Sequence, residues 1–202
     1  MSLPSVRPFA AAPRLAILTL LGSLTWLAAP SLPAAEAVTL APGEHVAIIG
    51  NALADRMQHH GWLETMMHQQ HPQHRLVVRN LAFSGDEVAV RPRSQDFGTP
   101  DQWLTRVQAS TIFAFFGFNE SFRGAAGLPQ FKQELEQFLR TTRAKNYNGL
   151  GPPRIVLFSP IANEAHPNPD LRLPPENNAN LALYTAAMAE VARDMDGVTF
   201  VD

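Results

Sequence analysis

Many hydrolases place a nucleophilic serine on the sharp turn where a buried strand ends and a helix begins. The stretch IIGNALADRM, residues 48–57, offers such a turn, because an apolar run stops at Gly50 and a helix-like pattern follows. Position 52, where a hydroxyl would attack, carries only the methyl group of alanine. The stretch therefore predicts the frame of an active site, with no attacking group at Ala52.

Two further apolar runs end in polar residues at a regular distance. The run that ends in NLAFSGD places Gly85 33 residues after Ala52, and the run that ends in GFNE places Asn119 34 residues after Gly85. Each interval fits one strand–helix unit. In doubly wound sheets the ligand crevice lies beyond the carboxyl ends of the strands. We therefore expect these three positions to lie around one crevice.

This order and rhythm of blocks resembles the SGNH (GDSL-type) hydrolase family of esterases and acylhydrolases, with GNAL in place of GDSL. The resemblance covers roughly residues 44–202. A narrower likeness is to the divergent SGNH-like domains of large secreted multidomain bacterial proteins, which can open with GNxL. The resemblance implies a flavodoxin-like fold of three layers, α/β/α. It also implies ester hydrolysis through an acyl-enzyme, on acylated carbohydrate or another small ester.

Carried over residue by residue, the resemblance implies that the Gly85 backbone N–H and the Asn119 side-chain amide form an oxyanion hole. Such donors stabilise the negative charge that develops on the ester oxygen during attack. Ala52 would occupy the nucleophile position, and Asn51 would replace the usual aspartate before it. We expect catalysis to be lost or strongly weakened, with a crevice that can still bind a small ester or carbohydrate.

The resemblance also implies a last block, Asp-x-x-His, that supplies the catalytic base. The sequence ends at Asp202 before such a block, so we expect a domain cut short there. His166 does not replace it, because Asn163 occupies the place of the aspartate. Two alternatives stay open: an active esterase that uses Ser84 or Ser121 in the crevice, with a base beyond this chain, or a purely structural module of a larger secreted protein.

Composition and charge exclude several other classes. The 202 residues include no cysteine, which excludes thiolate metal sites and cysteine nucleophiles. A net charge of −2 and a pI near 6.4 give no basic surface for nucleic acid. Five histidines lie in residues 59–74, but the run His68-x-x-His71-x-x-His74 spans a proline and contains no carboxylate, so we expect surface residues rather than a metal site. We expect neither a metal nor another cofactor.

The first 37 residues have the pattern of a secretory signal peptide. Two arginines precede an apolar stretch, residues 15–29, which is too short for a comfortable membrane span. Ala35-Glu36-Ala37 then supplies a cleavage site of small residues. We expect an exported, periplasmic or extracellular protein whose mature domain spans residues 38–202. If the segment is not cleaved, it would be the protein's one contact with a membrane.

The elements that must position these residues are visible as alternating patterns. Near-continuous apolar runs predict strands that are buried on both faces, and the segments between them repeat at helical spacing. Gly61 is expected to break or cap the first helical segment, and Thr99-Pro100 to begin another. The pattern therefore predicts a three-layer α/β fold with a mostly parallel, doubly wound sheet. The predicted strands are residues 45–50, 75–82, 111–118, 154–160 and 198–202, and the later helices follow 128–144 and 181–195.

Overall fold

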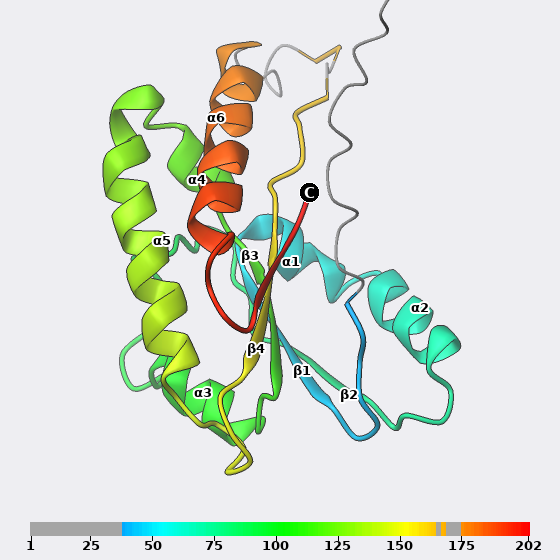
Figure 1. Ribbon diagram of the computed structural model, residues 1–202. Coiled ribbons are helices and arrows are strands. Elements are labelled where there is room, and N and C mark those ends of the chain that lie inside the picture. The colour runs from blue at the N-terminus through cyan, green and yellow to red at the C-terminus, as the bar shows by residue number, and fades with distance from the viewer. Residues whose placement is uncertain (1–37, 165–166, 169–174) are drawn as a thin grey trace, which may run out of the picture. The chain divides into compact units, whose positions relative to one another are not determined.

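The computed structural model describes residues 38–164, 167–168 and 175–202. The predicted leader and His166 lie outside these residues. Five strands form one parallel sheet in the order β2-β1-β3-β4-β5, which confirms the predicted fold class. Figure 1 shows this sheet between helices. The strands are β1 His45–Gly50, β2 Val77–Asn80, β3 Thr111–Phe115, β4 Arg154–Phe158 and β5 Val198–Val201.

Every predicted strand lies in the sheet, but four of the five are shorter than their apolar runs. The first strand alone has the predicted bounds. In the other four, the predicted apolar run continues for one to three residues past an end of the observed strand. Phe116, for example, follows the end of β3 and is still buried. The central strand β3 is buried along its whole length, which explains its unbroken apolar sequence.

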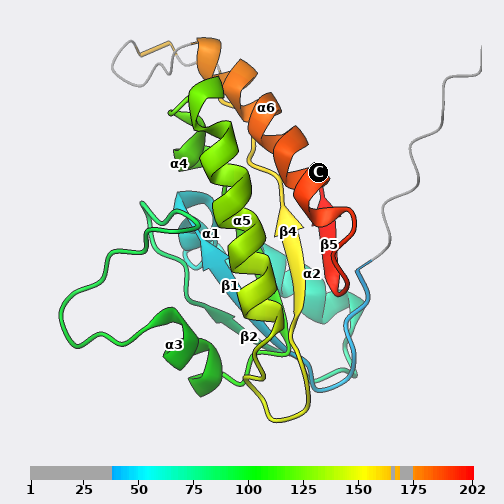
Figure 2. The same ribbon diagram turned by 60° about the vertical axis from the view of Figure 1, so that its left-hand side comes forward.

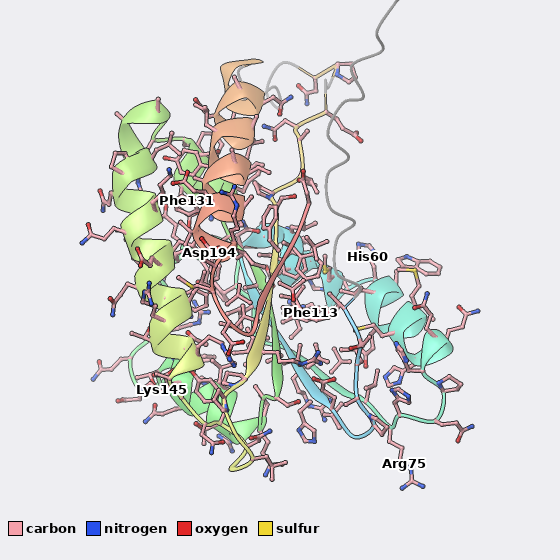
Figure 3. The ribbon with its side chains drawn as sticks, viewed as in Figure 1. His60, Arg75, Phe113, Phe131, Lys145 and Asp194 are labelled. Atoms are coloured by element: carbon pink, nitrogen blue, oxygen red, sulfur yellow. The ribbon has the colours of Figure 1, made fainter. Side chains whose placement is uncertain are left out.

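Helices cover both faces of the sheet, as Figures 1 and 2 show from two sides. One core cluster joins the sheet to α3, α5 and α6, and a second joins it to α1 and α2. In Figure 3 the labelled Phe113 belongs to the second cluster and Phe131 to the first. The helices are α1 Ala52–Met57, α2 Trp62–Gln70, α3 Pro100–Arg106, α4 Phe118–Ser121, α5 Leu128–Arg143 and α6 Pro175–Ala192, with a 3₁₀ turn at Ala125–Gly127.

The predicted helix boundaries are largely confirmed. Gly61 adopts a left-handed conformation with φ of 61° and separates α1 from α2. Thr99 caps α3 through a reciprocal bond with Gln102, and Pro100 takes the first helical position. The last helix ends at Ala192 rather than continuing through Met195, which packs on the core from the following turn. Among the helices described, none is both long and apolar enough to cross a bilayer.

Candidate active site

The topology brings the three predicted positions to one edge of the sheet. The chain passes from β1 to β2 on one side and then to β3 on the other side of β1. A crevice forms outside the carboxyl ends of the strands at such a switch point. Ala52 follows β1, Gly85 lies beyond the end of β2, and Asn119 lies beyond the end of β3.

The turn after β1 is held tightly against β3. Gly50 has φ of +128°, and a side-chain carbon there would lie 2.1 Å from the Phe115 carbonyl oxygen. The Asn51 N–H donates to that same oxygen at 3.0 Å. The Asn51 side-chain oxygen accepts from the Leu53 N–H at 3.2 Å and so caps α1. These backbone contacts fix the place of Ala52 without using its side chain.

Ala52 is exposed and lines a cavity of 420 Å³. The cavity lies between the first turn of α1 and the segment that follows β4. Its walls are mainly apolar, and its lining includes two charged residues, Arg56 and Glu164. This volume and lining suit a small organic ligand. The other main contributors are Phe115, Phe118, Pro160 and Ile161.

Gly85 and Asn119 lie beside each other. The Asn119 side-chain N–H₂ donates to the carbonyl oxygen of Asp86, the residue after Gly85, at 3.0 Å. Gly85 is exposed with φ of +94°, and its N–H has no acceptor among the residues that the structure describes. One N–H of the Asn119 amide likewise makes no hydrogen bond there. Two neutral donors are thus available at neighbouring positions on this edge, but neither Gly85 nor Asn119 lines the cavity at Ala52.

A buried carboxylate organises the loops that carry these donors. Glu120 is fully buried, and its two oxygens accept from the Gly117 N–H at 2.9 Å and the Val88 N–H at 2.8 Å. It therefore ties the turn that bears Asn119 to the loop that follows Gly85. Burial raises the pKa of Glu120 more than these backbone hydrogen bonds lower it.

The two serines predicted in the crevice differ in their surroundings. Ser84 is exposed, and its hydroxyl donates to a carboxylate oxygen of Asp55 at 2.5 Å. This hydrogen bond is the largest cause that holds the pKa of Asp55 below its ordinary value. Ser121 is fully buried and donates to the Phe118 carbonyl at 2.6 Å. Its hydroxyl is enclosed by protein and does not face an open cavity.

No histidine of the described segments lines the cavity at Ala52. His71 and His74 stack on each other with ring centres 4.7 Å apart, at the end of α2. Within residues 38–164, 167–168 and 175–202, no three side chains of metal-ligating type are grouped as a metal site requires.

The sequence interpretation did not identify three charged residues of this edge. Asp55 and Arg56 belong to α1, and Glu120 to α4. For Glu120 the sequence contains only a weak signal, a carboxylate shortly after a buried strand and between the polar residues Asn119 and Ser121. For Asp55 and Arg56 the sequence contains no signal, because the orientation of their side chains depends on how α1 packs on the sheet.

The family follows from a sequence profile. The profile of the GDSL-like Lipase/Acylhydrolase family matches residues 49–202, which include β1 from its fifth residue and all later elements. This chain belongs to that family. The match includes the turn with Ala52 and both donor positions. A search of curated proteins found no significant match.

Solved structures of low sequence identity share the fold of this GDSL-family domain. The M. smegmatis aryl esterase superposes with a TM-score of 0.57 at 12% identity, over 79% of this chain and 84% of that one. The carbohydrate acetylesterase Est24 from Sinorhizobium meliloti gives 0.56 at 9% identity, over 78% and 83%. A gut microbial diltiazem-metabolizing enzyme gives 0.58 at 18% identity, over 81% of this chain but 37% of that protein.

Proposed function

We propose that this GDSL-family domain binds a small ester or an acylated carbohydrate, and that its esterase chemistry is lost or strongly weakened. The observation that carries the proposal is the methyl group of Ala52 at the head of α1, facing a ligand-sized cavity. Attack on an ester carbonyl needs a nucleophile, and a methyl group cannot act as one. The sequence GNAL has alanine where the family motif GDSL has serine.

We assign Gly85 and Asn119 as the donors for the ligand's carbonyl oxygen. Their N–H groups lie side by side on neighbouring loops, and two of them have no protein acceptor in the described part of the chain. Such donors bind a ground-state carbonyl as well as a developing oxyanion, although the oxyanion more strongly. Retained donors without a nucleophile therefore favour binding over turnover.

The ligand class rests on the family and on solved proteins that share the fold. These proteins include an aryl esterase and a carbohydrate acetylesterase. The mainly apolar walls at Ala52 suit an acyl or aryl group, and Arg56 and Asn163 supply polar contacts at the margin. We also propose that the protein is exported and that the mature chain begins near Val38.

One rival function has support from a specific contact. Ser84 is exposed beside Gly85 and hydrogen-bonded to Asp55, so it is a candidate for an unusual nucleophile. A carboxylate whose pKa is lowered is a weak base, however, and this makes Asp55 a poor activator of a hydroxyl. Local bonding between a loop serine and a helix explains the contact without catalysis.

Hydrolysis of acetyl and butyryl nitrophenyl esters tests the proposal. We expect the wild type, Ala52→Ser and Ser84→Ala all to stay far below the rate of a competent esterase. A serine without its base is left with only the roughly 10³–10⁴-fold residual catalysis over water that binding and the donors supply. Wild-type turnover that Ser84→Ala abolishes would establish the rival function. Robust turnover by Ala52→Ser would show that a base already lies within this chain.

Binding is tested separately by thermal unfolding with acetylated xylo-oligosaccharides or phenyl acetate. A ligand at 100 times its Kd adds about 2.7 kcal/mol to the stability of the folded state. Ala52→Phe, which fills the cavity, should remove this stabilisation. Ala182→Phe, at an exposed position of α6, is the matched control and should retain it. Equal stabilisation of both variants would place the ligand elsewhere and contradict the proposal.

A further inference from the structure

A second cavity of 280 Å³ lies between the end of β2, helix α3 and the loop that joins them. It shares no lining residue with the cavity at Ala52. Aromatic rings and charged groups are combined in its walls. The residues that matter for its chemistry are Phe83, Asp86, Arg91, Arg93, Phe97 and Trp103.

One of the two arginines is fully paired. The Asp86 carboxylate is 2% exposed and accepts from Arg93 Nη1 at 2.7 Å and from Arg93 Nη2 at 2.8 Å. This bidentate geometry is the strongest form of an arginine–carboxylate contact. The Arg93 guanidinium also lies 4.8 Å from the ring centre of Phe83 and 5.9 Å from that of Phe97. The pair is electrically neutral and holds the aromatic rings in place.

The other arginine has no carboxylate partner. Arg91 Nη2 donates to the Val88 carbonyl at a long 3.3 Å, and Arg91 Nε is enclosed with no hydrogen-bond partner in the described ranges. No ion pair to Arg91 exists there either. Its guanidinium lies 5.0 Å and 4.8 Å from the ring centres of Phe116 and Phe138. Burial lowers the pKa of Arg91, although an arginine remains charged at neutral pH.

Arg91 is half-buried, and a cation in such a position is unfavourable unless a group of opposite charge pairs with it. Burying an unpaired charge is costly, and buried polar groups almost always have hydrogen-bond partners. The Phe116 and Phe138 faces offset part of this cost through cation–π attraction. Arg91 Nε itself has no accessible surface, so a ligand could reach only the other N–H groups of the guanidinium. The wall of the cavity therefore includes one arginine without an ion-pair partner in the described ranges, beside apolar residues.

We propose that this cavity binds a small apolar carboxylate, with its carboxylate on Arg91 and its ring or chain against Phe83, Phe97 and Trp103. A planar guanidinium pairs with a carboxylate through two parallel hydrogen bonds. A neutral ligand would leave the charge of Arg91 unpaired. The 280 Å³ volume is near the lower end for ligand pockets, which sets the size at about that of benzoate. The site depends on neither Ala52 nor catalysis.

Calorimetric titration with sodium benzoate and with benzamide, its neutral analogue, tests the site on the intact mature domain. Hydrogen bonds to charged groups are worth enough to make benzoate bind about 10-fold to 100-fold more tightly than benzamide. Arg91→Gln should lower benzoate affinity to the level of benzamide. Arg140→Gln removes an exposed arginine of α5 and should leave benzoate affinity unchanged.

Two results would overturn the proposal: equal affinity for benzoate and benzamide in the wild type, or benzoate affinity that Arg91→Gln does not change. If circular dichroism shows that Arg91→Gln fails to fold, a measurement on the wild type alone still tests the site. The assigned Nε–H resonance of Arg91 should then shift on addition of benzoate and not on addition of benzamide. An unmoved resonance at saturating benzoate would place the acid elsewhere and refute the site.

Discussion

The turn before Ala52 depends on the absence of a side chain at Gly50, and this dependence can be measured. Gly50 is buried with φ of +128°, and an added Cβ would meet the Phe115 carbonyl oxygen at 2.1 Å, the carbonyl carbon at 2.7 Å and the amide nitrogen at 2.9 Å. All three atoms are backbone of the central strand. They cannot move aside without disturbing the pairing of β1 with β3.

The magnitude has two parts. A residue with a side chain in a sparsely populated left-handed conformation costs about 1–3 kcal/mol. Overpacking against a close neighbour costs a further 1–3 kcal/mol or so. Gly50→Ala should therefore lower the free energy of unfolding by about 2–6 kcal/mol. This is a large fraction of the total for a domain of this size.

Gly43→Ala provides the matched control. Gly43 also has a positive φ, +74°, but nothing lies within 4 Å of an added Cβ. Gly43→Ala should lower the free energy of unfolding only by the conformational cost, about 1–3 kcal/mol. The less flexible unfolded chain of this variant offsets a small part of that loss. Urea unfolding followed by circular dichroism measures both variants. Equal losses at the two positions would refute the close approach of β1 and β3 as the reason for Gly50.

Two further predictions concern the charged residues of this edge. Glu120→Ala leaves the Val88 and Gly117 N–H groups without an acceptor and should cost about 2–6 kcal/mol, at 1–3 kcal/mol for each. Because burial raises the Glu120 pKa above its unfolded value, near 4.3, this contribution is full below that value and falls as pH rises through the folded pKa. Urea unfolding of the wild type and of Glu120→Ala should therefore show a larger loss of unfolding free energy at pH 5 than at pH 8. A larger loss at pH 8 would contradict this prediction. Ser84→Ala should raise the pKa of Asp55 toward its ordinary value, as carboxyl ¹³C NMR titration would show, and an unchanged pKa would remove the role given to the Ser84 hydroxyl.

The sheet could be predicted because strands that are buried on both faces have almost continuously apolar sequences. A stretch such as IVLF or FAFF has no polar residue to place at a surface, so the existence of these strands could be expected. Strand ends were less well predicted. The apolar run 111–118 continues past Phe115 because Phe116 is still buried after pairing ends.

The second cavity could not be predicted, for a physical reason. Residues 85–98 have no hydrophobic period and include proline and several charges, so sequence spacing does not indicate which side chains turn inward. Asp86 and Arg93 meet across seven positions of irregular chain, and Arg91 reaches between Phe116 and Phe138 from distant elements. Such contacts depend on the folded path of the loop. The composition of a polar loop therefore does not indicate which of its arginines lies between aromatic rings, as Arg91 does.

At the turn after β1, too, the backbone path does not depend on the side chain at position 52, which supports the proposal that this GDSL-family fold binds a ligand without a nucleophile. The backbone N–H of Asn51, the side-chain cap of α1 and the two backbone bonds of Glu120 hold the loops in position. The side chain at position 52 takes part in none of them, and it lines the cavity beside α1. A methyl group there in place of a hydroxymethyl group would remove a nucleophile and leave these contacts intact, so the binding role that we propose for Gly85 and Asn119 does not depend on turnover.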